Sequence, residues 1–105
     1  MKEISVEDLA RWRHEGKTFV LLDVREPYEV AAASLPQSVT IPMRDVPSRL
    51  DELPQDTPIA VLCHHGGRSE RVAQFLSARG FSDVANVDGG IDAYAKRVDP
   101  SIPRY

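Results

Sequence analysis

Two unbroken apolar stretches of strand length constrain the fold of this chain more than any other feature. They are TFVLLDV at residues 18–24 and PIAVLC at residues 58–63, and neither alternates between apolar and polar positions. A strand with one face in water alternates in this way, whereas a strand buried on both faces reads as a continuous apolar run. Both stretches therefore predict strands of a parallel sheet that helices cover on its two faces.

Helix signals separate the expected strands. Ser5 and Asp8 have the spacing of a capping box for a first helix that ends near Gly16, and Pro27 suits the first turn of a short second helix. The further expected elements are short strands within 38–43 and 83–87, a helical turn near 48–53, a helix that ends at Gly80, and a last helix within 89–98. This alternation predicts an α/β domain with a mostly parallel sheet and right-handed crossovers.

Length and composition predict one domain over residues 1–105, because 105 residues with 42% apolar content suffice for one core. The net charge of −3 gives no basic stripe, so nucleic acid and anionic membranes are not expected partners. The charged start MKEISVEDLARWRHEG is unlike a signal peptide, and no apolar run reaches the roughly 18 residues of a membrane span. We expect a cytoplasmic protein without a membrane segment.

Cys63 is the only cysteine, and it stands where the second apolar run ends. A single cysteine cannot close an internal disulfide, which leaves a buried inert thiol, a reactive thiol or a thiol that pairs with another molecule. In parallel α/β sheets, sites form beyond the carboxyl ends of the strands. Cys63 is therefore expected at the edge of the sheet where a functional site would lie.

The residues after Cys63 favour the reactive alternative. Gly66 and Gly67 let the backbone curl, so that successive amides from His64 to Ser69 can converge on one anionic atom. Arg68 adds a positive charge, and the helix that follows directs the positive end of its dipole at the same place. The segment therefore predicts a loop that favours the thiolate and holds an anion attached to the sulfur.

The length of this loop separates it from that of the cysteine phosphatases, which also place a strand, a loop and a helix around a cysteine. Their signature has one residue more between the cysteine and the arginine. Here only four residues, those from His64 to Gly67, lie between Cys63 and Arg68. The smaller cradle suits a single extra sulfur atom better than a phosphoryl group.

Three motifs in order, LLDVREPYEV, CHHGGRS and GFSDVANVDGGIDAY, resemble those of the rhodanese family of sulfurtransferases, and specifically of its small single-domain members. The resemblance implies a five-stranded sheet flanked by helices. It also implies that Cys63 cycles between thiol and persulfide as sulfur passes from a donor such as thiosulfate to a thiol or cyanide acceptor. No cofactor is implied.

The tail VDPSIPRY supports an alternative of a different class. It resembles the tail of rhodanese domains that are fused to adenylyltransferases in sulfur-carrier pathways. The chain would then be a sulfur-relay or adaptor domain that acts on a partner protein, with little turnover of free thiosulfate. Both alternatives use the same cysteine.

The resemblance further implies that Asp23 and Arg25 belong to a polar network that braces the active loop, although the residues alone also fit turn chemistry and a surface ion pair. His64 and His65 are expected on the rim of the site, facing the substrate or partner. Adjacent histidines suit a metal poorly, and we expect no metal site. Two further arginines can stand near the cleft or in solvent: Arg44 and Arg49.

Overall fold

Five short parallel strands form the centre of the structure, a computed structural model that describes residues 1–105. They are β1 (Lys2–Ile4), β2 (Val20–Asp23), β3 (Val39–Thr40), β4 (Ile59–Leu62) and β5 (Val84–Val87). Their order across the sheet is β1-β5-β4-β2-β3, and every neighbouring pair is parallel. The predicted fold class, a mostly parallel five-stranded sheet flanked by helices, is confirmed.

Four α-helices and two 3-10 helices flank the strands. They are α1 (Val6–His14), α2 (Pro27–Ala32), η1 (Met43–Ser48), η2 (Leu50–Glu52), α3 (Gly67–Ala78) and α4 (Gly90–Arg97). The predicted capping box opens α1, where the Ser5 hydroxyl accepts from the Asp8 amide at 3.0 Å and the Asp8 carboxylate accepts from the Ser5 amide at 3.2 Å. None of these helices is long and apolar enough to cross a membrane.

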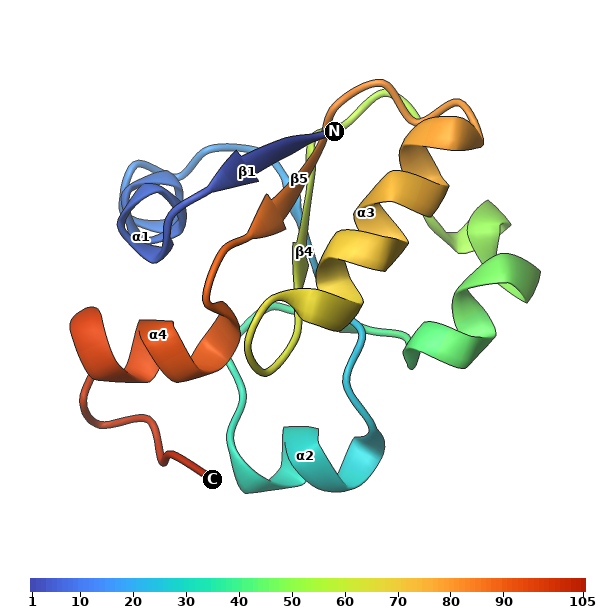
Figure 1. The fold of residues 1–105 in the computed structure, drawn as a ribbon. Coiled ribbons are helices and arrows are strands. Elements are labelled where there is room, and N and C mark those ends of the chain that lie inside the picture. Colours follow the sequence, from blue (N-terminus) through green and yellow to red (C-terminus); the bar gives the residue numbers. More distant parts are fainter.

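Two apolar cores, one on each face, explain the unbroken apolar sequence of the central strand β4. Ala60 and Leu62 pack into the core on the side of α1 and α4, while Ile59 and Val61 pack into the core on the side of α3. Figure 1 shows α1 and α4 on one side of the strands and α3 with the two 3-10 helices on the other. A strand between two cores has no position at which a polar side chain would be solvated.

Two segments differ from the elements read from the residues. The three-residue edge strand β1 was not expected from the sequence pattern, and it pairs only with β5. Where one helical turn was expected near 48–53, two 3-10 helices fill 43–52. Pro47 lies inside η1 and has no amide hydrogen to donate, which disfavours a longer α-helix there.

The carboxyl ends of the strands mark the place where a site can form. In Figure 1 the arrowheads of β4 and β5 point toward the end of the molecule where α2, the start of α3, the start of α4 and the last residues of the chain gather. The loop from β4 into α3, which carries Cys63, begins there.

Candidate active site

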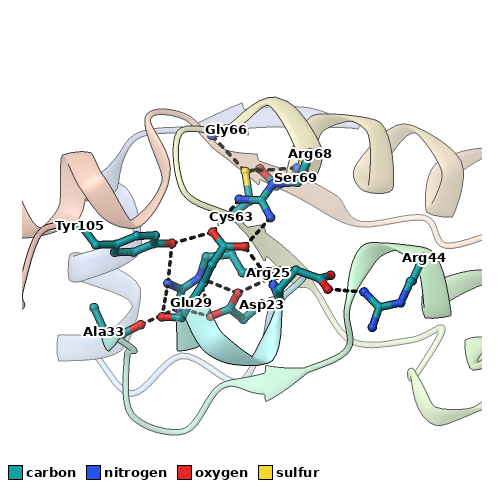
Figure 2. A network of polar contacts seen from close by, with 11 residues as sticks. Asp23, Arg25, Glu29, Ala33, Arg44, Cys63, Gly66, Arg68, Ser69 and Tyr105 are labelled. Carbon is teal, nitrogen blue, oxygen red and sulfur yellow. Dashed lines mark hydrogen bonds and ion pairs between the residues drawn. The ribbon is translucent and has the colours of Figure 1, made fainter. Parts of the chain in front are cut away.

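Cys63 follows β4 directly and is 1% exposed. Its Sγ accepts hydrogen bonds from the amide of Gly66 at 3.1 Å and from the amide of Ser69 at 3.4 Å, and it lies 3.2 Å from the Ser69 hydroxyl (Figure 2). Gly66 caps α3 with a φ of 109°, a left-handed conformation that favours glycine. The sulfur therefore lies at the positive end of a twelve-residue helix with two amides directed at it.

The N-terminus of α4 fixes the orientation of this loop. The amides of Ile91 and Asp92 donate to the carbonyls of Cys63 at 2.9 Å and His64 at 3.1 Å. A Cβ on Gly90 would lie 2.4 Å from both carbonyl oxygens, so only glycine permits this approach. With its carbonyls held by α4, the loop is free to turn its following amides toward the sulfur.

Arg68 forms a bidentate ion pair with Glu29 of α2, with distances of 2.7 and 2.8 Å. The side chain of Arg68 is 33% exposed and that of Glu29 is 6% exposed. This hydrogen-bonded pairing lowers the pKa of Glu29 to about 2, against the opposing effect of burial, and raises the pKa of Arg68. The sequence placed Arg68 in the loop as a positive charge, and the structure adds a carboxylate that neutralises it.

The pair of Asp23 and Arg25 lies just past the end of β2, and both side chains are completely buried. Arg25 donates to Asp23 at 2.7 Å and to the backbone carbonyls of Glu29 and Ala33 at 3.3 and 2.7 Å. Burial lowers the pKa of Arg25, but hydrogen bonds to Asp23 and then Tyr105 outweigh it, so the pKa is raised. A surface ion pair, which the residues alone also allowed, is excluded.

Tyr105 joins this buried pair to the loop. Its hydroxyl accepts from Arg25 at 2.9 Å and donates to the Glu29 carboxylate at 2.9 Å, while its ring stacks on His64 with a centroid distance of 4.0 Å. Burial raises the pKa of Tyr105, which keeps the donating proton in place. Figure 2 shows the resulting chain of contacts, which runs from the end of β2 through Glu29 to Arg68.

The two histidines of the loop occupy different environments. His65 is 68% exposed, with its Nδ1 3.8 Å from the carboxylate of Asp92, as expected of a residue on the rim. His64 lies between the rings of Tyr105 and His65, and its Nε2 is buried without a hydrogen-bond partner. Burial and then the neighbouring His65 lower the pKa of His64. His64 is therefore partly covered by the neighbouring rings, in contrast to the exposed His65.

A sequence model of the rhodanese-like domain matches residues 5–97 of the chain. The chain belongs to the rhodanese-like domain family. The match includes β2, the loop from Cys63 to Ser69 and α4, while Tyr105 lies beyond it.

Individual relatives of this rhodanese-like domain agree with the match. The chain is 42% identical over its whole length to the chloroplastic Rhodanese-like/PpiC domain-containing protein 12 of Arabidopsis thaliana, of which it spans 38%. It is 36% identical to the thiosulfate sulfurtransferase GlpE of Pseudomonas syringae, over 89% of the chain and 86% of that protein. The crystal structure of a rhodanese-like domain protein from Staphylococcus aureus superposes with a TM-score of 0.86 at 30% identity, covering 100% and 99% of the two chains.

The sequence did not decide whether Arg44 and Arg49 stand near the cleft or in solvent. Both lie in exposed ion pairs of the rhodanese-like domain. Arg44 pairs with Glu26, and Arg49 donates to Glu52 at 2.7 and 2.8 Å. No three His, Cys, Asp or Glu side chains come together as a metal-binding group.

Three residues of the site were missed by sequence reasoning. Asn86, which accepts from the Ser69 hydroxyl at 2.5 Å, is the one polar residue of β5, and a buried polar residue in an apolar strand is a usable signal. Glu29 lies in the first turn of the short helix α2, where the helix dipole favours a carboxylate, and this position is a usable signal. For Tyr105 the sequence carries no comparable signal.

Proposed function

We propose that the chain is a sulfurtransferase that carries sulfane sulfur as a persulfide on Cys63. The observation that supports this best is the position of Sγ, which accepts from the amides of Gly66 and Ser69 at the start of α3. Such a place favours an anionic sulfur over a neutral one. The name of the related thiosulfate sulfurtransferase adds support from a protein with 36% identity.

In the proposed first half-reaction, the Cys63 thiolate attacks the outer sulfur of thiosulfate. A new sulfur–sulfur bond forms as the sulfur–sulfur bond of the donor breaks, and sulfite leaves with the electron pair. The product is a persulfide anion on Cys63. Gly67 and Arg68, at the first two positions of α3, have amides without an intrahelical acceptor and are suited to bind its outer sulfur.

In the second half-reaction, a thiol or cyanide attacks this outer sulfur, and the thiolate of Cys63 leaves. No net oxidation occurs over the cycle, so the chemistry calls for no redox cofactor. Asp23 and Arg25 are assigned a supporting role. They hold α2 in place, and α2 presents the carboxylate of Glu29 that orients Arg68.

A second candidate is a sulfur-relay domain that takes sulfur from a persulfide on a partner, such as a protein of a sulfur-carrier pathway. The pairing of Arg68 with Glu29 favours it, because the carboxylate offsets the only cationic side chain of the loop near the sulfur. A thiosulfate dianion would meet less positive charge than the sequence suggests. A persulfide donor depends less on that charge.

The test compares wild type with Cys63→Ser after incubation with thiosulfate and, separately, with glutathione persulfide. We expect wild type to gain the mass of one sulfur atom and to form thiocyanate with cyanide, and Cys63→Ser to do neither, because serine cannot hold a persulfide. Unchanged circular dichroism of the variant serves as the control. Substantial turnover by Cys63→Ser would overturn the assignment.

The choice of donor separates the candidates. Loading by glutathione persulfide alone supports the relay domain, whereas efficient loading by thiosulfate supports the free enzyme. A third outcome would exclude both candidates. If neither donor changed the mass of the wild type and the wild type hydrolysed an aryl phosphate, the protein would be a phosphatase.

A further inference from the structure

A chain of hydrogen bonds leads from the sulfur, past β5, to the edge strand β1. The Cys63 Sγ lies 3.2 Å from the Ser69 hydroxyl, which lies 2.5 Å from Oδ1 of Asn86. Nδ2 of Asn86 in turn lies 2.9 Å from the carboxylate of Glu3 on β1. Asn86 and Ser69 are buried, while Glu3 is exposed at the edge strand. The transfer chemistry described above makes no use of Asn86 or Glu3.

Glu3, at the outer end of this chain, determines which atom donates in each hydrogen bond. A carboxylate can only accept, so Asn86 directs its Nδ2 donor at Glu3 and its Oδ1 acceptor at Ser69. The hydroxyl of Ser69 has one hydrogen, and the Asn86 oxygen takes it. The hydroxyl therefore presents a lone pair to the sulfur, and the hydrogen between Cys63 and Ser69 belongs to the thiol.

This arrangement stabilises the neutral thiol and opposes the anion. A thiolate or persulfide would meet the lone pair of the Ser69 oxygen unless the hydroxyl turned from Asn86 to the sulfur. After that turn, Oδ1 of Asn86 would be buried without a donor, which is unfavourable. The amides of Gly66 and Ser69 favour the anion, so two sets of contacts act on the sulfur in opposite directions.

We propose that Asn86, oriented by Glu3, is a positioning residue that controls the direction of the Ser69 hydroxyl and thereby restrains the reactivity of the Cys63 sulfur. The inference rests on the proposed function only in treating Cys63 as the nucleophile. Ionisation or sulfur loading requires the hydroxyl to reorient from Asn86 to the sulfur. The nucleophile is thus restrained until an anion at the sulfur outcompetes the amide oxygen.

Glu3→Gln tests this control from the protein surface. A glutamine can donate as well as accept, so Asn86 can turn its amide, present Nδ2 to Ser69 and release the hydroxyl to the sulfur. At one fixed neutral pH, we expect Cys63 of this variant to react with iodoacetamide roughly threefold to tenfold faster than wild type, the range that one redirected hydrogen bond provides. The ultraviolet absorption of the thiolate should rise in parallel.

Two controls separate the hydroxyl from other effects. Glu7→Gln, on the exposed side of α1, removes a carboxylate that pairs with Arg97 and should leave alkylation unchanged. In a Ser69→Ala background there is no hydroxyl to redirect, so adding Glu3→Gln should change nothing, whereas a simple charge effect of Glu3 would persist.

The proposal is overturned if Glu3→Gln leaves alkylation and thiolate absorption at wild-type values, or raises them equally in the Ser69→Ala background. Thermal unfolding of each variant verifies that the fold is retained. Alkylation does not require a sulfur donor, so failure here leaves the sulfur-loading test of Cys63 intact. The two proposals can therefore fail separately.

Discussion

Two arginine–carboxylate pairs lie at the same end of the sheet, and they differ in burial. The side chains of Asp23 and Arg25 are both 0% exposed, whereas the side chain of Arg68 is 33% exposed and that of Glu29 is 6% exposed. The buried pair also binds two backbone carbonyls and the hydroxyl of Tyr105. The pair of Arg68 and Glu29 lies beside the loop of Cys63, and its arginine reaches solvent.

This difference in burial determines what each pair can do. A buried ion pair cannot lose one member without leaving an uncompensated charge, so it holds one geometry. The partly exposed side chain of Arg68 can turn toward an incoming anion, while the Tyr105 hydroxyl and the Glu26 amide continue to donate to the buried carboxylate of Glu29. We therefore assign structural support to Asp23 and Arg25 and anion handling to Arg68.

Breaking the buried pair should have the largest effect. Asp23→Ala leaves the guanidinium of Arg25 unpaired in the core, and we expect the free energy of unfolding to fall by about 3–5 kcal/mol in urea denaturation. The matched control is Arg97→Ala, which breaks an exposed pair with Glu7 and should cost less than about 1 kcal/mol. Equal losses for the two variants would contradict the division of roles.

The second largest effect should come from acid, which protonates Glu29 and so weakens its pair with Arg68. The pKa of Glu29 is lowered from 4.5 to about 2, chiefly by its hydrogen bond to Arg68. A lowered carboxyl pKa contributes its stability above the unfolded value and loses it as the pH falls toward the folded one, here up to about 3 kcal/mol between pH 5 and pH 2. In urea denaturation at a series of pH values, Glu29→Gln should show a flatter curve than wild type. Identical slopes would count against the pairing.

Removing the loop cation should act on activity more than on the fold. Arg68→Ala deletes charge-assisted hydrogen bonds worth roughly 1.5–3 kcal/mol each, so we expect sulfur loading of Cys63 to slow at least about tenfold. Arg68→Lys keeps the charge without the bidentate geometry and should recover only part of the rate. Loading at the wild-type rate in Arg68→Ala would remove Arg68 from the site.

The smallest effect should come from the hydroxyl that links the two pairs. Tyr105→Phe keeps the ring on His64 but loses the bonds to Arg25 and Glu29, and we expect a loss of about 1 kcal/mol in unfolding free energy. Tyr105→Leu also removes the stacking and should lose more. If the two variants matched wild type in stability, Tyr105 would contribute nothing to the network.

Much of the fold could be predicted because it depends on local patterns. The apolar runs gave β2 and β4, the spacing of Ser5 and Asp8 gave the start of α1, and the glycines after Cys63 gave the curled loop. Each of these signals lies within a few residues of its effect. By contrast, the three residues of β1 are too few for a period, and their pairing with β5 depends on the assembled sheet.

The partners of the site residues could not be predicted in the same way. Arg68 binds Glu29, which lies 39 positions away in the sequence, and Tyr105 donates to Glu29 from 76 positions away. Such contacts depend on how helices and tail pack after the sheet forms, and the sequence of the loop gives no information about them. The stacking of His64 on Tyr105 has the same origin.

The contact between the loop and α4 bears on when the cysteine becomes reactive during synthesis. The carbonyls of Cys63 and His64 are held by amides of Ile91 and Asp92, which leave the ribosome after the loop itself. Contacts between distant parts of a chain form late, because closing a long loop costs entropy. A nascent chain therefore presents Cys63 as a free thiol, and its anion cradle is completed only when β5 and α4 dock. The contacts that favour an anionic sulfur and those that oppose it are therefore complete only in the finished domain.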